Sequence, residues 1–236
     1  MPRDPHRDQP VLLSGAPLPE AAGVLVLLHG RGGSAQDMLA LARDLQTSPP
    51  SPEGRGGQGV RPNGDGARGR GQFACFVPEA AGRQWYPYSL LEKPERNRSH
   101  LSSALALLER VLEKVAAADV PPERVVLLDF SQGASVTLEF AARNARRYGG
   151  LVALSGALLG PEGTPRDYTG SLAQTPVFLG AGDRDPHLPR RRVDEAAAVF
   201  ERLGATVTKR IYPGLAHAID PDEIAYARGM LDAVCG

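Results

Sequence analysis

A serine in a sharp turn between a predicted strand and a predicted helix is the first chemically informative feature. Ser131 follows the apolar run 125–128 in the segment Asp-Phe-Ser-Gln-Gly, and an apolar-periodic helix follows it. This is the sequence context of a nucleophile elbow, which lifts the serine hydroxyl above the edge of the sheet. At a helix N-terminus, the dipole and the free N–H groups favour developing negative charge. Ser131 is therefore the predicted nucleophile.

The predicted base is His217, which follows another predicted strand in the segment Pro-Gly-Leu-Ala-His. The chain order Ser, Asp, His is that of the α/β-hydrolases. We expect His6 in a frayed terminal tail, His100 precedes a predicted helix, and His187 lies before the segment Leu-Pro-Arg-Arg-Arg, which is typical of a solvated helix entry. The alternative for His217 is a hydrogen-bonded loop histidine without a catalytic role.

Two aspartates are candidates for the acid that orients the imidazole. Asp183 and Asp185 both lie in the loop Gly-Asp-Arg-Asp-Pro, and Asp185 follows Ser131 by 54 residues. Their spacing does not separate them, because a loop of this length can present either carboxylate. Either one could instead form a turn or cap a helix.

A glycine-rich loop after the apolar run 24–28 is the candidate for anion stabilisation. It begins His29-Gly30-Arg31, and the glycine lets the backbone turn sharply. The backbone N–H groups of Arg31 and Gln132 could then form an oxyanion hole. A phosphate loop is the weaker interpretation, because Gly-Arg-Gly-Gly lacks the lysine and the spacing of a Walker motif.

Asp129 stands two residues before Ser131, where the elbow pattern calls for a small residue. The turn there is crowded and strained, so a charged side chain needs an explanation. One interpretation is a tolerated substitution whose carboxyl finds a hydrogen-bond partner, and the other is an altered or impaired active site. A carboxylate near the histidine would raise the histidine pKa, whereas burial without a partner would raise the pKa of Asp129 itself. Asp129 is thus a candidate modulator.

The elements that position these residues alternate along the chain. Helical patterns lie between most of a set of short apolar runs, which read as buried strands. This alternation predicts an α/β fold with a mostly parallel sheet and helices on both faces, and catalytic loops at the carboxyl ends of the strands. The predicted strands are 24–28, 73–77, 125–129, 151–154, 177–180 and 207–212. The predicted helices are 36–45, 101–115 with Ser99, Ser102 or Ser103 as the cap, 132–146, 191–203 and 221–234.

Composition narrows the class of protein. The 236 residues favour one domain, and 27 basic residues balance 27 acidic ones, which argues against nucleic acid as a partner. Glycine and proline make up about a fifth of the chain, against an average near 12%, and 12 of them lie in residues 49–71. We expect residues 47–72 to form a flexible Gly/Pro/Arg-rich insertion. Two cysteines, no signal peptide and no apolar run of about 20 residues indicate a cytoplasmic protein without a membrane span.

Four segments taken together identify a family resemblance. LLHGRGGSAQDM, FSQGAS, GAGDRDP and YPGLAH resemble the phospholipase/carboxylesterase family of small α/β-hydrolases, which includes acyl-protein thioesterases. The resemblance covers about residues 24–231 apart from the insertion. It implies ester or thioester hydrolysis without a cofactor or metal. It also implies Ser131 as nucleophile, His217 as base, Asp185 as acid, and the N–H groups of Arg31 and Gln132 as oxyanion donors. Asp129 replaces the first glycine of the family's elbow.

The expected activity is that of a serine carboxylesterase acting on short-chain esters. Trp85 and Tyr86 resemble the aromatic pocket loop of the family, although both could simply cover a core edge. The alternatives are an acyl thioesterase or lysophospholipase, and a catalytically impaired binding protein in which Asp129 disturbs the elbow. The expected partner is a small-molecule ester, and a homodimer is compatible with the sequence.

Overall fold

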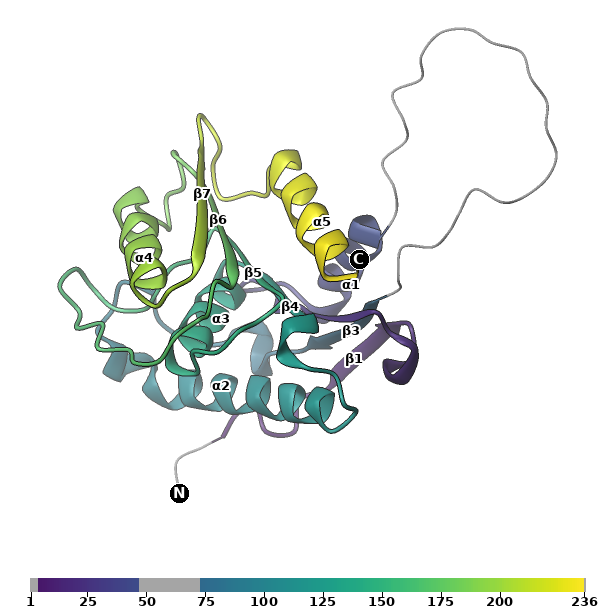
Figure 1. The fold of residues 1–236 in the computed structure, drawn as a ribbon. Coiled ribbons are helices and arrows are strands. Elements are labelled where there is room, and N and C mark those ends of the chain that lie inside the picture. Colours follow the sequence, from purple (N-terminus) through teal and green to yellow (C-terminus); the bar gives the residue numbers. More distant parts are fainter. Residues whose placement is uncertain (1–3, 47–72, 236) are drawn as a thin grey trace, which may run out of the picture.

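A twisted sheet with helices on both faces carries the loops of interest (Figure 1). The computed structural model describes residues 4–46 and 73–235, so the predicted 47–72 insertion lies outside the described residues. Within these ranges the strand order is β1-β3-β2-β4-β5-β6-β7. Only β1 and β3 pair in antiparallel fashion, and the other neighbours are parallel. The predicted α/β class with a mostly parallel sheet is confirmed.

All six predicted strands are present, and one further strand lies at the edge. Strand β2 ends two residues earlier than predicted, because the Leu28 N–H donates to the side chain of Asp129 instead of to a neighbouring strand. The unpredicted strand, β1, is a half-exposed edge strand with Leu13 60% exposed, so it lacks the buried apolar run that marks the others. The bounds are β1 Val11–Gly15, β2 Gly23–Val26, β3 Phe73–Pro78, β4 Val125–Phe130, β5 Gly150–Leu154, β6 Pro176–Gly182 and β7 Thr206–Tyr212.

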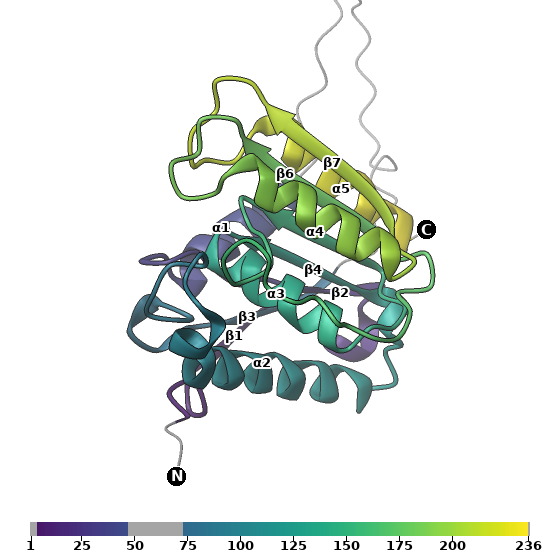
Figure 2. The same cartoon turned by 90° about the vertical axis from the view of Figure 1, so that its left-hand side faces the viewer.

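The helices divide between the two faces of the sheet (Figure 2). One face is covered by α1 (Ala35–Gln46) and α5 (Pro221–Cys235), which share an apolar cluster with it. The other face is covered by α2 (Pro94–Ala116), α3 (Gln132–Arg143) and α4 (Arg190–Arg202). Across the described ranges, no helix combines the length and the hydropathy needed to cross a membrane.

The start of α2 differs from the sequence expectation. The helix begins at Pro94, which suits a first helical position because that position leaves its N–H without an intrahelical partner. Ser99, Ser102 and Ser103 lie inside the helix, so the prediction that one of them is the cap was wrong. Ser103 is buried and its hydroxyl instead accepts the backbone N–H of His6 at 2.8 Å.

The topology gathers the chemically loaded loops at one edge of the sheet. From β2 the chain passes to β3 on one side and then to β4 on the other side, so the topological switch point lies between β2 and β4. The loop 27–34 leaves β2 at this point, and Ser131 follows β4 directly. The loops after β6 and β7 reach the same edge, since all four strands are parallel.

Candidate active site

Ser131, His217 and Asp185 form one continuous series of hydrogen bonds. The Nε2 atom of His217 lies 2.8 Å from the Oγ atom of Ser131. Its Nδ1 atom lies 2.6 Å from Oδ2 of Asp185. The imidazole is thereby held by the carboxylate on one side and faces the hydroxyl on the other. These are the contacts that a general base and its orienting acid need.

The elbow places Ser131 in a left-handed backbone conformation, with φ 55° and ψ −115°. Its N–H donates to the Leu154 carbonyl at 2.8 Å, which fixes the turn to the neighbouring strand. Gly133 then allows α3 to approach β2, because a Cβ atom at this position would lie 2.3 Å from the Leu28 carbonyl oxygen. The small residue two places after the serine is thus a steric requirement of this turn.

The geometry separates the two candidate acids. The Asp185 carboxylate is fully buried, and its Oδ1 accepts the N–H groups of His187 at 2.8 Å and Leu188 at 3.1 Å, which leaves Oδ2 for His217. Asp183 is exposed and its Oδ1 accepts the Gly214 N–H at 2.6 Å. Asp183 therefore ties the loop after β6 to the loop after β7, whereas Asp185 contacts the imidazole.

Arg31 and Gln132, whose backbone N–H groups are the predicted oxyanion donors, line the same pocket as Ser131. Gln132 is the first residue of α3, so its N–H has no partner inside the helix. The N–H of Arg31 has no acceptor within the part of the chain that the structure describes. His29 stabilises the loop that carries Arg31. Its Nδ1 lies 2.7 Å from the Gly30 carbonyl oxygen, and its Nε2 accepts the Ala80 N–H at 3.0 Å. Neither N–H group therefore has a backbone acceptor among the described residues.

The side chains of Arg31 and Gln132 form hydrogen bonds to the loop 84–88, which the sequence did not indicate. The Arg31 guanidinium donates to Oε1 of Gln84 and to the carbonyls of Tyr86, Pro87 and Tyr88, at 2.9 to 3.0 Å. The Gln132 amide accepts the Trp85 N–H at 3.0 Å and donates to the Tyr86 carbonyl at 2.8 Å. The two residues proposed as oxyanion donors thus also hold the loop 84–88 over the pocket.

A pocket of about 500 Å³ opens beside the Ser131 hydroxyl. Tyr86, although only 1% exposed, is among its lining residues. Trp85 is not, and its buried Nε1 donates to the His29 carbonyl at 2.7 Å. The remaining lining residues, apart from Arg31, are uncharged or histidine, namely Pro87, Tyr88, Ser89, Leu90, Leu91, Gln132, Ser155, Pro186, His187, Leu188 and His217. Over residues 4–46 and 73–235, no three His, Cys, Asp or Glu side chains gather in an arrangement that could hold a metal ion.

One of the histidines set aside from sequence lies elsewhere than expected, and another lines the pocket. His6 is fully buried instead of frayed, and its ring contacts the Trp85 carbonyl at 3.0 Å and accepts the Ala81 N–H at 3.1 Å. Burial lowers the pKa of His6. His187 is exposed but lines the pocket, with its ring edge-on to that of His217 at a centroid distance of 5.1 Å.

Asp129 points into the junction of β2, β4 and α3, where its contacts differ from those of the triad. It is fully buried, and its Oδ1 accepts the Leu28 N–H just before the loop that carries Arg31. Oδ2 has no hydrogen-bond partner among the described residues. Burial raises the pKa of Asp129 to about 8, and the nearby Thr137 hydroxyl and the Leu28 N–H oppose this only in part. Burial therefore favours the protonated form of the carboxyl.

Replacing Asp129 by asparagine is expected to stabilise the protein increasingly as the pH rises from about 4 to 8. Between the unfolded and the folded pKa of Asp129, the folded protein keeps a proton that the unfolded chain has released, so the stability of the wild type falls as the pH rises and levels off above the folded pKa. An asparagine side chain at this position would retain the acceptor for the Leu28 N–H without titrating. The difference in unfolding free energy between variant and wild type should grow by up to about 1.4 kcal/mol per pH unit.

Urea unfolding from pH 5 to pH 9 measures this difference. Asp8→Asn, at an exposed position, is the control and should leave the curve unchanged. An Asp129→Asn variant less stable than wild type at pH 9 would show that the carboxylate has a favourable role that its contacts do not reveal.

Comparison with known proteins agrees with the fold and the site. The model of the phospholipase/carboxylesterase family matches residues 72–235. Acyl-protein thioesterase 1 of Kluyveromyces lactis is 28% identical over 209 residues, covering 86% of this chain and 88% of the relative. That of Debaryomyces hansenii is 32% identical over 133 residues, so the match spans 57% of the relative's length.

A solved structure extends the similarity over nearly the whole chain. The crystal structure of a phospholipase/carboxylesterase from Dyadobacter fermentans has a TM-score of 0.81 and 36% sequence identity, covering 95% of this chain and 96% of that one. The family model alone matches well over half of the residues. The protein therefore belongs to the phospholipase/carboxylesterase family, and it is a hydrolase of the α/β-hydrolase superfamily.

Proposed function

We propose that the protein hydrolyses short-chain carboxylic esters through an acyl-enzyme intermediate on Ser131. The observation that carries this proposal is the unbroken hydrogen-bonded series from the buried Asp185 through His217 to the Ser131 hydroxyl. The lengths of both contacts, 2.6 and 2.8 Å, suit proton transfer without prior rearrangement of the site.

The chemistry proceeds in two halves. The Ser131 oxygen attacks the ester carbonyl carbon while its proton passes to Nε2 of His217, and the N–H groups of Arg31 and Gln132 stabilise the oxyanion. The imidazolium, held by Asp185, then returns the proton to the leaving alcohol. A water molecule attacks the acyl-enzyme by the same route, which releases the acid and restores Ser131. Every step uses groups of the protein and water.

The size and lining of the pocket support a small ester with an apolar chain. A volume of about 500 Å³ lies in the lower half of the range for small-molecule sites. Leu90, Leu91 and Leu188 supply apolar walls, and two large apolar side chains of this pocket, Tyr88 and Leu91, are exposed at its surface. These walls can contact a short acyl or alcohol chain, while Ser131 and His217 meet the ester group.

A thioesterase is the second candidate, because two relatives that align along most of this chain are named acyl-protein thioesterase 1. The same triad and oxyanion donors would serve a thioester. The catalytically impaired alternative is less favoured, since the Asp129 carboxyl makes its contact with Leu28 while the Ser131–His217 distance stays at 2.8 Å.

The test compares p-nitrophenyl acetate, butanoate and octanoate, together with the matched pair phenyl acetate and phenyl thioacetate. We expect turnover of the acetate and butanoate well above the buffer rate and a lower kcat/KM for the octanoate. A higher kcat/KM for the octanoate or the thioester would favour the second candidate. Equal rates for wild type and Ser131→Ala on every substrate would refute the proposed function.

A further inference from the structure

A second serine, Ser155, lies beside Ser131 at the carboxyl end of the neighbouring strand. Phe130 of β4 pairs with Leu154 of β5, so Ser131 and Ser155 are the next residues on two adjacent parallel strands. Neighbouring strands are about 4.8 Å apart. The hydrogen bond from the Ser131 N–H to the Leu154 carbonyl, at 2.8 Å, holds the two strand ends together. Ser155 is therefore an immediate neighbour of the proposed nucleophile.

The hydroxyl of Ser155 is buried and lacks a partner. The residue is 2% exposed, and its Oγ has no hydrogen bond within the described part of the chain. Most buried polar side chains in proteins have at least one such bond, so an unpaired hydroxyl calls for an explanation. Ser155 lines the same pocket as Ser131 and His217. Because Ser155 belongs to the pocket lining, rotation about its Cα–Cβ bond would turn the buried hydroxyl toward a molecule bound there.

The backbone of Ser155 has an unusual conformation that its surroundings maintain. Its φ is 51°, close to the 55° of Ser131, and both values lie in the left-handed region that side chains other than glycine rarely adopt. Its N–H donates to the Gly180 carbonyl at 2.8 Å. Such conformations persist where the surrounding structure fixes them, and they cluster at functional sites.

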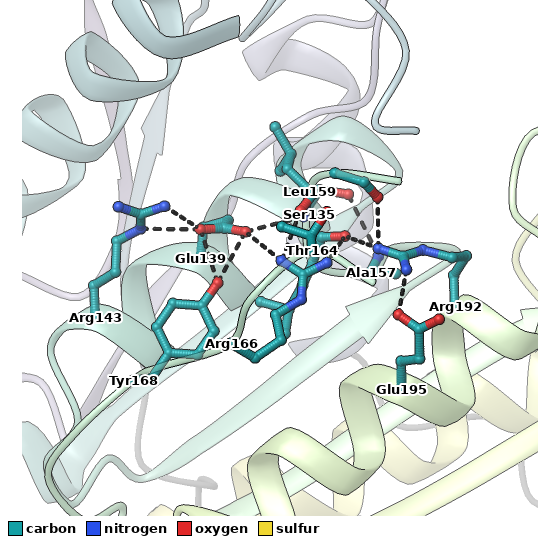
Figure 3. Close-up of polar contacts among 12 residues, drawn as sticks. Ser135, Glu139, Arg143, Ala157, Leu159, Thr164, Arg166, Tyr168, Arg192 and Glu195 are labelled. Atoms are coloured by element: carbon teal, nitrogen blue, oxygen red, sulfur yellow. Dashed lines mark hydrogen bonds and ion pairs between the residues drawn. The ribbon is translucent and has the colours of Figure 1, made fainter. Parts of the chain in front are cut away.

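The segment that follows Ser155 is anchored by a buried polar network (Figure 3). Glu139 of α3 accepts the Leu159 N–H at 2.9 Å. Arg192 of α4 donates to the carbonyls of Leu158 and Gly160 at 2.9 and 2.7 Å. Both charged side chains are buried, and both hold backbone groups within five residues of Ser155. The network therefore presents the Ser155 hydroxyl on a fixed backbone, as a specific binding group requires.

We propose that Ser155 is a specificity-determining residue that hydrogen-bonds a polar substituent next to the ester group of the substrate. The inference rests on the proposed function, because the ester carbonyl is placed by Ser131. A hydroxyl on the carbon attached to the carbonyl, or on the alcohol portion near the ester oxygen, lies within reach of a residue one strand away. The hydroxyl of Ser155 both donates and accepts, so a substrate hydroxyl suits it.

Three small esters separate the two locations of the substituent. Ethyl propanoate is the parent, ethyl 2-hydroxypropanoate carries the hydroxyl on the acyl side, and 2-hydroxyethyl propanoate carries it on the alcohol side. For wild type, we expect kcat/KM to be about fivefold to tenfold higher for one hydroxy ester than for the parent. Ser155→Ala should abolish this preference, so that the ratio of kcat/KM for the preferred hydroxy ester to kcat/KM for the parent falls about fivefold to tenfold.

Stability and a second serine provide the controls. Ser155→Ala removes an unpaired hydroxyl, so its Tm should equal or exceed that of wild type. If it fails to fold, Ser155→Gly carries the same test, since glycine tolerates the left-handed φ. Ser171→Ala removes an exposed hydroxyl that accepts the Ala173 N–H at 3.1 Å and is not part of the pocket lining, so it should keep the substrate preference.

The outcomes distinguish this inference from the function on which it rests. Hydrolysis of all three esters with the same relative rates in wild type and Ser155→Ala would overturn the role of Ser155 alone. An equal loss on all three esters in Ser155→Ala would also overturn it, because a specificity residue must change the ratio. If wild type hydrolyses none of the esters above the buffer rate, the proposed function fails and the inference fails with it.

Discussion

Ser131→Ala is expected to lower kcat for p-nitrophenyl acetate by about 10⁶-fold, and His217→Ala by a similar factor. Without the hydroxyl no acyl-enzyme forms, and without the imidazole the hydroxyl proton has no acceptor at 2.8 Å. Because the two residues act as one unit, the double variant should be no slower than either single variant. The residual rate over buffer would come from substrate binding and the oxyanion donors.

The fold-reductions in kcat are measured by stopped assays of p-nitrophenyl acetate hydrolysis with the purified variants. Circular dichroism and Tm should match wild type for Ser131→Ala, since the change removes one oxygen at the edge of the pocket. Multiplying effects in the double variant would show that Ser131 and His217 work independently, which contradicts the proposed proton transfer. A His217→Ala variant with wild-type kcat would point to another base, and His187, 5.1 Å away between ring centroids, would be the first to replace.

Asp185→Asn is expected to lower kcat by about 10⁴-fold, whereas Asp183→Asn should change it by less than about fivefold. The asparagine side chain at position 185 presents either its NH₂ group or its carbonyl oxygen to Nδ1 of His217. The imidazole then lacks the carboxylate that stabilises its charged form and fixes its tautomer. Asparagine at 183 keeps an amide oxygen that can accept the Gly214 N–H. The two variants form a matched pair, because they make the same change two residues apart.

The measurement is kcat for p-nitrophenyl acetate, with KM determined for each variant. We expect the loss in Asp185→Asn to fall on kcat, because the buried carboxylate contacts the imidazole and is absent from the residues that line the pocket. Comparable losses in both variants would mean that the two loops act mainly by holding each other in place. A larger loss in Asp183→Asn would reverse the assignment of the acid.

The local sequence predicted most strands of the sheet and the residues of the candidate triad. A short apolar run predicts a buried strand such as β4. The turn at Ser131 is predicted by the strand before it, the small residue at position 133 and the apolar helix after it. Chain order then indicated His217. Spacing left the acid open between Asp183 and Asp185, and only the family resemblance implied Asp185. In the structure, the N–H groups of His187 and Leu188 orient the Asp185 carboxylate toward the imidazole.

Features that depend on distant segments were not predictable. The burial of His6 depends on the Trp85 carbonyl and the Ala81 N–H, which lie 79 and 75 residues away along the chain. Strand β1 is defined by its antiparallel pairing with β3 more than by an apolar pattern of its own. The clamp of Arg31 on the loop 84–88 binds backbone carbonyls, which carry no side-chain signal.

For Asp129, the sequence predicted an unusual position but not the direction of the carboxyl group. Its position in the elbow marked it as unusual, and the two alternatives for its carboxyl followed from general electrostatics. The direction of the carboxyl required three-dimensional information, because β4 could turn it toward the catalytic loop or toward α3. Its hydrogen bond to the Leu28 N–H ends β2 early and places the carboxyl beneath the loop that carries Arg31.

Covalent labelling tests the central claim, that Ser131 is the activated nucleophile, most directly. The wild-type protein is treated with a fluorophosphonate, its intact mass is measured, and the modified residue is located by peptide mapping. We predict one phosphonyl adduct, located on Ser131, with loss of p-nitrophenyl acetate turnover in proportion to labelling. Treated protein that keeps full turnover while Ser131 stays unlabelled, or stoichiometric labelling at another residue, would contradict the account.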